Sequence, residues 1–226
     1  MVKVSLFTML FGLVVLKADR TIKLNIAEPS DLCERIDGQG FVIVSDQGKI
    51  FETDSEGKVT RTSPFTGVDF EACCTFNGGY LVVQERLRKV SFLNTDLEEQ
   101  YSKVIPYFGG KNKGYESIIY NDEENKIILI TEKEPIHVME LNTNLEVLND
   151  RIFDYDGDIS GGVYHDGFYH LLSDENYEVL KVRPSDLAIL TKQKVKVLNP
   201  EGICIKGKAT LILSDNMATL NWFTLK

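Results

Sequence analysis

Five short segments of the chain share one form and recur at nearly constant spacing. Each opens on Ser or Glu and becomes apolar by its fourth residue: Ser30-Asp31-Leu32-Cys33, Glu71-Ala72-Cys73-Cys74, Glu116-Ser117-Ile118-Ile119, Ser160-Gly161-Gly162-Val163 and Glu201-Gly202-Ile203-Cys204. The opening residues are separated by 41, 45, 44 and 41 positions. A repeat of roughly 40–50 residues is the usual length of one four-stranded β-propeller blade. The spacing therefore predicts five blades.

The remainder of each repeat supplies the other strands of a blade. Turn pairs follow each opening strand, at 37–38, 77–78, 122–123, 166–167 and 206–207. Second strands, each ending on an acidic residue, are predicted at 41–46, 80–85, 127–132, 169–174 and 210–215. Third strands are predicted at 49–54, 89–94, 136–141, 178–183 and 218–224. Fourth strands are predicted at 58–65, 99–107, 146–153 and 188–198.

The fifth repeat reaches only its third strand before the last residue, Lys226. Residues 21–26 offer the missing fourth strand, which would close the ring and cover an open sheet edge. We therefore predict an all-β, five-bladed β-propeller whose last blade is closed by the N-terminal strand. The alternative is an open sandwich of the same strands, but five units in phase are what radial repetition predicts.

The N-terminus has the pattern of an export signal. Lys3 precedes an apolar run over residues 4–16, and Ala18 could stand before a cleavage point. Residues 1–18 are thus predicted to be a signal peptide and residues 19–226 the propeller domain. This predicts export to a periplasm, cell envelope or extracellular space, with membrane association only if the segment stays uncleaved. The alternatives are a buried strand or an uncleaved anchor.

Charge and cysteine spacing exclude several classes of function. The net charge is −9 and no Lys/Arg-rich block stands out, which argues against nucleic acid as a partner. The chain has no Cys-x-x-Cys pair and no nucleophile elbow. Cys33, Cys74 and Cys204 share one repeat position with Ile119 and Val163, so this position is predicted to be a core position. We expect a monomer.

The opening residues carry the candidate metal chemistry. First strands of propeller blades line the central channel, so five side chains should form a ring around the axis: Ser30, Glu71, Glu116, Ser160 and Glu201. Three converging carboxylates would repel one another, and a cation would remove that cost. We predict Ca²⁺, which prefers flexible shells of oxygen ligands. The alternative is that these carboxylates are solvated or bonded to backbone N–H groups.

A second group of charged residues is predicted on the same face. Acidic residues end the second strands: Asp46, Glu85, Glu132, Asp174 and Asp215. Basic residues follow nearby in two loops, Arg86, Arg88, Lys111 and Lys113, and could hold a small anionic ligand beside the metal. The alternatives are ordinary hairpin bonding for the acidic residues and solvation for the basic ones.

Several of these segments also resemble a known family. The segments 28–32 (EPSDL), 113–117 (KGYES), 158–161 (DISG) and 200–203 (PEGI) look like the SdiA-regulated (YjiK-like) domain of bacterial proteins. The resemblance covers most of the chain from about Thr21 onward. It implies an exported or envelope-associated β-propeller, with no established reaction to carry over. Gly162 departs from the family, which more often has an apolar residue after Ser-Gly.

The ring order Ser, Glu, Glu, Ser, Glu is also similar to the central calcium site of calcium-activated apyrases, which are five-bladed propellers that hydrolyse nucleotides. Two hypotheses follow. The first is a calcium-binding propeller that acts as a binding or scaffold module of the cell envelope, with a small anionic ligand or an envelope protein as partner. The second is a calcium-dependent phosphohydrolase acting on nucleotides or other phosphate esters. The short blades leave little chain for substrate loops and favour the first.

Overall fold

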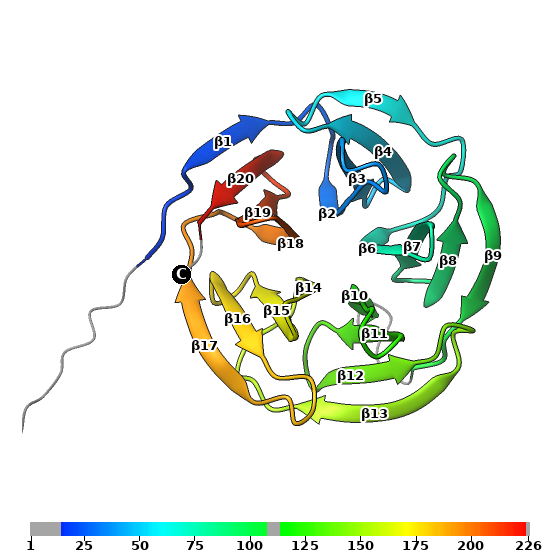
Figure 1. Ribbon diagram of the computed structural model, residues 1–226, viewed down its shortest axis with the longest axis vertical. Coiled ribbons are helices and arrows are strands. Elements are labelled where there is room, and N and C mark those ends of the chain that lie inside the picture. The colour runs from blue at the N-terminus through cyan, green and yellow to red at the C-terminus, as the bar shows by residue number, and fades with distance from the viewer. Residues whose placement is uncertain (1–14, 108–113, 225–226) are drawn as a thin grey trace, which may run out of the picture.

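The computed structural model describes residues 15–107 and 114–224, which form five four-stranded sheets arranged around a central axis (Figure 1). The predicted five-bladed propeller is confirmed. Blade 1 contains β2 (Pro29–Glu34), β3 (Gly40–Ser45), β4 (Lys49–Asp54) and β5 (Val59–Thr62). Blade 2 contains β6 (Phe70–Phe76), β7 (Gly79–Gln84), β8 (Lys89–Leu93) and β9 (Glu99–Val104).

The other blades repeat this antiparallel order from the axis outward. Blade 3 contains β10 (Tyr115–Asn121), β11 (Lys126–Thr131), β12 (Ile136–Leu141) and β13 (Val147–Phe153). Blade 4 contains β14 (Gly161–His165), β15 (Phe168–Ser173), β16 (Glu178–Val182) and β17 (Ile189–Lys194). Blade 5 contains β18 (Pro200–Lys206), β19 (Ala209–Ser214), β20 (Thr219–Phe223) and, as its outer strand, β1 (Arg20–Lys23).

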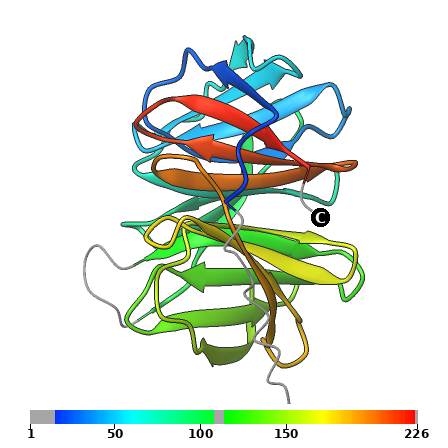
Figure 2. The ribbon, with the colours of Figure 1, turned by 90° about the vertical axis from the view of Figure 1, so that its left-hand side faces the viewer.

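The pairing of β1 with β20 closes the ring, as the sequence predicted. The register pairs Arg20 with Trp222 and Lys23 with Thr219, and Figure 2 shows β1, in blue, on the outer side of β20, in red. Because β1 and β20 come from opposite ends of the described chain and share one sheet, blade 5 depends on both strands.

Two outer strands are shorter than predicted because of proline. The prediction for blade 1 ran to residue 65, but β5 ends at Thr62, before Ser63 and Pro64. In blade 2, β9 ends at Val104, two residues before Pro106. Proline lacks the N–H group that a ladder requires, so the sheet stops on its N-terminal side.

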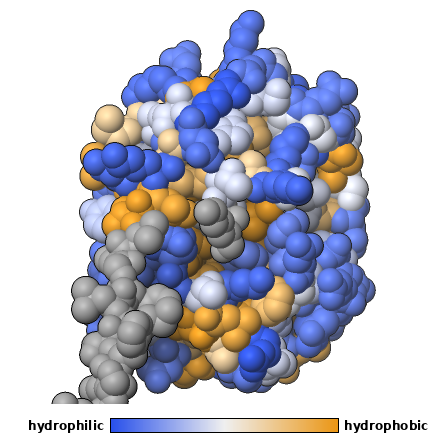
Figure 3. All heavy atoms as spheres, turned by 60° about the vertical axis from the view of Figure 1, so that its left-hand side comes forward, coloured by the Kyte–Doolittle hydropathy of each residue, from blue (hydrophilic) through white to orange (hydrophobic). Residues whose placement is uncertain are grey.

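The hydrophobic core lies between neighbouring blades. The core position of the repeat faces the next blade: Cys33 packs in the cluster between blades 1 and 2, Cys74 between blades 2 and 3, and Cys204 between blades 5 and 1. Tyr80, Tyr115 and other large side chains are fully buried in the same interfaces. The outer wall seen in Figure 3 is mainly hydrophilic, with apolar side chains in separate areas.

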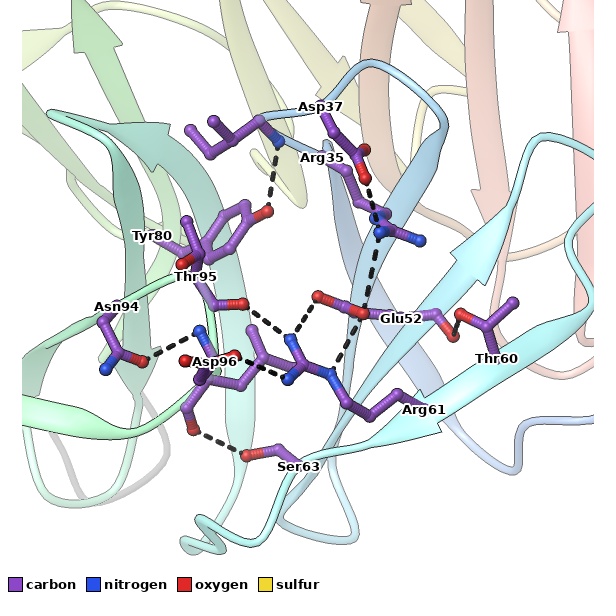
Figure 4. Close-up of polar contacts among 12 residues, drawn as sticks. Arg35, Asp37, Glu52, Thr60, Arg61, Ser63, Tyr80, Asn94, Thr95 and Asp96 are labelled. Atoms are coloured by element: carbon purple, nitrogen blue, oxygen red, sulfur yellow. Dashed lines mark hydrogen bonds and ion pairs between the residues drawn. The ribbon is translucent and has the colours of Figure 1, made fainter.

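A polar latch joins the outer part of blade 1 to blade 2 (Figure 4). Arg61 on β5 donates to both carboxylate oxygens of Glu52, at 3.1 and 2.6 Å. The same guanidinium donates to the carbonyl of Thr95 at 2.6 Å and pairs with Asp96 at 3.2 Å, both on the β8–β9 turn of the next blade. Arg151 repeats the pattern between blades 3 and 4, on Glu140 and the carbonyl of Ser185.

The described chain begins with a strap against blade 4. Leu16 pairs with Val195, donating its N–H to Lys194 and accepting from the N–H of Lys196. Leu16 and Ala18 pack on the core between blades 4 and 5. The rest of the predicted signal peptide, residues 1–14, lies outside the described residues. Among the residues described, none forms a helix long and apolar enough to cross a membrane.

Candidate functional site: an acidic cavity at one mouth of the channel

The five predicted ring residues line a single cavity of about 350 Å³ at one end of the inner strands: Ser30, Glu71, Glu116, Ser160 and Glu201. Their direction has a local cause. In blades 1, 2, 3 and 5 the register between first and second strands shifts at the ring residue, so that this residue lies in a β-bulge. A bulge adds an unpaired residue and turns its side chain away from the regular alternation. The repeated bulge thus directs these side chains toward the axis.

The acidic residues after the second strands line the same cavity: Asp46, Glu85, Glu132, Asp174 and Asp215. They reach it because an antiparallel second strand ends where the first strand begins.

Two further carboxylates, Asp69 and Asp158, also line the cavity and were missed by sequence reasoning. Each stands two residues before a ring residue. A comparison of the five repeats at the position two residues before the ring residue would have revealed both carboxylates. Asp69 has a φ of 59°, in the left-handed region that Asp tolerates better than most residues.

The lining of the cavity is strongly unbalanced in charge. Among the described residues, its lining consists of ten carboxyl groups, two serine hydroxyls and a single guanidinium, which belongs to Arg86. Arg86 Nε lies 2.7 Å from Asp69 Oδ2 and so offsets only part of this charge. Glu132 has a partner at the rim, since Lys133 Nζ lies 2.7 Å from its carboxylate.

Burial and crowding raise the pKa of the ring carboxyls. Loss of hydration, followed by repulsion from Asp46, Asp69, Glu85 and Glu201, raises the pKa of Glu71 to about 9. Burial and neighbouring carboxylates raise the pKa of Glu201 to about 8. The same causes hold the pKa of Glu116 well above its ordinary value. Without a cation, the raised pKa values of Glu71 and Glu201 favour their protonated forms at neutral pH.

A tighter group lies within the cavity, on blade 2. Asp69, Glu71 and Glu85 each offer an oxygen atom, and these atoms lie within 4.8 Å of one another. This group could hold a metal ion. Glu85 is fixed from the far side, because the N–H of Gly114 donates to its Oε1 at 2.8 Å. These three residues all belong to blade 2 or to the loop before it, whereas the sequence suggested a ring with residues from all five blades.

The two serines have their hydroxyl hydrogens engaged. Ser30 Oγ donates to Asp46 Oδ1, and Ser160 Oγ donates to the carbonyl of Pro200 at 2.7 Å. Each oxygen keeps lone pairs that can approach a cation.

The basic residues predicted on this face are not all placed at the cavity. Arg86 lines it. Arg88 is directed elsewhere, since its guanidinium donates to the carbonyl of Tyr107 and lies 5.7 Å from the centre of that ring. Lys111 and Lys113 lie outside the described residues. The roles of all these side chains as ligands stay predictions.

A family model connects this geometry to known proteins. The SdiA-regulated model matches residues 33–216, which is most of the chain. The chain belongs to the SdiA-regulated family. The resemblance noted in the short segments is thereby confirmed.

Solved structures similar to this SdiA-regulated protein share its propeller fold. Glutaminyl cyclase of Myxococcus xanthus matches with a TM-score of 0.73 and 10% identity, over 92% of this chain and 97% of that one. The β-propeller domain of Myceliophteria thermophila Cps50 (Swd1) matches at 0.57 and 8%, over 92% and 99%. Virginiamycin B lyase of Staphylococcus aureus matches at 0.56 and 12%, over 88% and 66%. At these identities the likeness concerns the fold alone.

Proposed function

We propose that this SdiA-regulated propeller binds Ca²⁺ in its acidic cavity and acts as a binding or scaffold module of the cell envelope. The observation that carries the proposal is the charge of the cavity, ten carboxyl groups against one guanidinium in about 350 Å³. Such crowding is costly unless protons or a cation neutralise it. A divalent cation does so while using the carboxylates as ligands.

The donor set favours calcium over other metals. Every candidate ligand in the described lining is an oxygen atom, and neither His nor Cys is among them. Zinc sites use His and Cys, so zinc fits poorly. Ca²⁺ accepts six to eight oxygens at roughly 2.3–2.6 Å in irregular geometry, which suits carboxylates that come from several blades. Asp69, Glu71 and Glu85 would be the core of the site, with Glu116, Glu201 and the two serines completing it.

An anionic ligand would approach this cavity through the metal. Carboxylates without a metal repel anions. Bound Ca²⁺ would add positive charge, and so does the adjacent Arg86 at the rim, whose side chain is 61% exposed. The second function, calcium-dependent hydrolysis of nucleotides or other phosphate esters, would use the same arrangement. A panel of nucleotides and phosphomonoesters, assayed with calcium and with a chelator, separates the two functions. Hydrolysis that occurs in calcium and is abolished by the chelator would favour the second function over a binding module.

Thermal unfolding tests the metal proposal. A ligand that binds only the folded state stabilises it by about 2.7 kcal/mol at 100 times its dissociation constant. We therefore expect the melting temperature to rise with calcium and to fall when a chelator is added. An unchanged melting temperature from micromolar to millimolar calcium would refute the proposal.

A further inference from the structure

The end of the channel opposite the acidic cavity holds a second cavity, also of about 350 Å³, lined by all four cysteines of the chain. Cys33, Cys73, Cys74 and Cys204 are reduced and buried in the structure. Phe76 and Tyr164 are among the other side chains that line it. None of these residues belongs to the proposed calcium site.

Two side-chain hydrogen bonds hold the inner strands of blades 1 and 2 in register. The N–H of Cys73 donates to Asp31 Oδ2 at 2.9 Å, and Thr75 Oγ1 donates to the carbonyl of Glu34 at 2.6 Å. Asp31 and Glu34 flank Cys33 on β2, while Cys73 and Thr75 belong to β6. These bonds therefore keep Cys33 beside Cys73.

The thiols of Cys33 and Cys73 are in contact within the interface between the two blades. Both belong to the same buried cluster, together with Val42. Val42 is the cross-strand partner of Cys33, and the sulfur of Cys73 lies 3.8 Å from the carbonyl oxygen of Val42. Burial, and then contact with the thiol of Cys33, raises the pKa of Cys73.

The other two cysteines face different interfaces. Cys74 packs between blades 2 and 3, and Cys204 packs between blades 5 and 1. Cys33 and Cys73 are thus the cysteines that share an interface, although Cys74 is the immediate neighbour of Cys73 in sequence. This makes Cys74 a matched control.

We propose that Cys33 and Cys73 form a disulfide that joins the inner strands of blades 1 and 2. Formation replaces two S–H bonds by one S–S bond. The two electrons and two protons pass to a small disulfide oxidant, which is cleaved to two thiols. The cavity gives such an oxidant a route to the pair. A cross-link between residues 40 positions apart lowers the conformational entropy of the unfolded chain and so stabilises the folded state.

Peptide mapping of the full chain tests the bond. The protein is incubated with oxidised glutathione, alkylated under denaturing conditions and digested without reductant. We expect one linked peptide pair that contains Cys33 and Cys73, with Cys74 and Cys204 alkylated. We also expect the melting temperature to rise by about 5–10 °C, reversibly on reduction. Alkylation of all four cysteines, or a link that uses Cys74, would overturn the proposal.

Matched variants locate the effect. Cys33→Ala should abolish both the link and the rise in melting temperature on oxidation, while Cys74→Ala should keep both. If Cys33→Ala does not fold, the peptide map of the unaltered chain still decides the question. Neither readout involves calcium, so this result stands apart from the calcium proposal.

Discussion

Glu71 occupies a place that suits a carboxylate only when positive charge is near. Its side chain is turned inward by a bulge, its oxygens lie close to those of Asp69 and Glu85, and its pKa is raised to about 9. At neutral pH without metal it is therefore protonated, at a cost relative to the unfolded chain, where it would ionise. Calcium would replace that proton. Glu71 thus lowers the stability of the metal-free protein and contributes to calcium binding when the metal is present.

Replacing Glu71 by Gln should separate these two effects. In chelator at about pH 8 we expect Glu71→Gln to be more stable than the unaltered protein, by roughly 1–3 kcal/mol, because a neutral amide avoids the cost of taking up a proton on folding. In calcium the order should reverse, since an amide oxygen attracts a hard cation less. Denaturant unfolding in both conditions measures this. Equal stability of the two proteins in both conditions would contradict it.

The raised pKa values also predict how stability depends on pH. Glu71 and Glu201 titrate near 9 and 8 in the folded state and near 4.5 when unfolded, so the folded state binds more protons between these values. The metal-free protein should lose stability as pH rises from about 5 to 9. With saturating calcium this loss should be smaller. Unfolding free energies measured across that range in chelator and in calcium provide the check, and a metal-free stability that rises over it would contradict the account.

The strands position these side chains by repetition. Each blade contributes a bulge at the start of its first strand or, in blade 4, a loop residue directly before it, and each second strand ends at the same face. The outer strands then bind one blade to the next, as Arg61 does for blades 1 and 2 (Figure 4). Glu52 is only 6% exposed, so its charge depends on Arg61 and on the more distant Arg35.

Arg61→Ala should therefore destabilise the protein by about 2–4 kcal/mol, because it leaves the carboxylate of Glu52 buried without its main partner. Arg183→Ala is the control. Arg183 pairs with Asp186 in the same exposed turn, and such pairs contribute at most about 1 kcal/mol. Denaturant unfolding compares the two variants. A similar, small loss in both would show that the latch does not stabilise the ring.

We expect β1 to contribute more to stability than the segment before it, which contacts blade 4 through Leu16. Removing residues up to Lys23 leaves β20 without its outer partner and exposes it as the edge of blade 5, so we expect aggregation or a large loss of stability. Removing residues up to Ala18 deletes, among the described contacts, the bridge of Leu16 and the packing of two partly buried apolar side chains, at a cost of about 1–2 kcal/mol. Melting temperatures and light scattering of the two truncated proteins distinguish these outcomes.

At the scale of the whole molecule, the sequence predicts the architecture well because a propeller is a repetition. The regular spacing of Ser30, Glu71 and the three other ring residues predicts the number of blades and the order of their strands. It also predicts the face on which the acidic residues gather. What it does not predict depends on contacts between blades. The proximity of Asp69 to Glu85, and the turn of Arg88 toward Tyr107, arise from loop conformations that periodicity does not encode.

Calorimetric titration of the chelator-treated protein with calcium decides whether the acidic cavity binds this metal. We expect one Ca²⁺ per chain at about pH 7.5 and proton release on binding, because the metal displaces protons from the ring carboxyls. Glu71→Gln should weaken binding by at least about tenfold. Glu146→Gln, a change on an exposed outer turn, should leave binding unaltered. Absence of binding to the unaltered protein, or binding that Glu71→Gln does not affect, would contradict the claim that the acidic cavity is a calcium site.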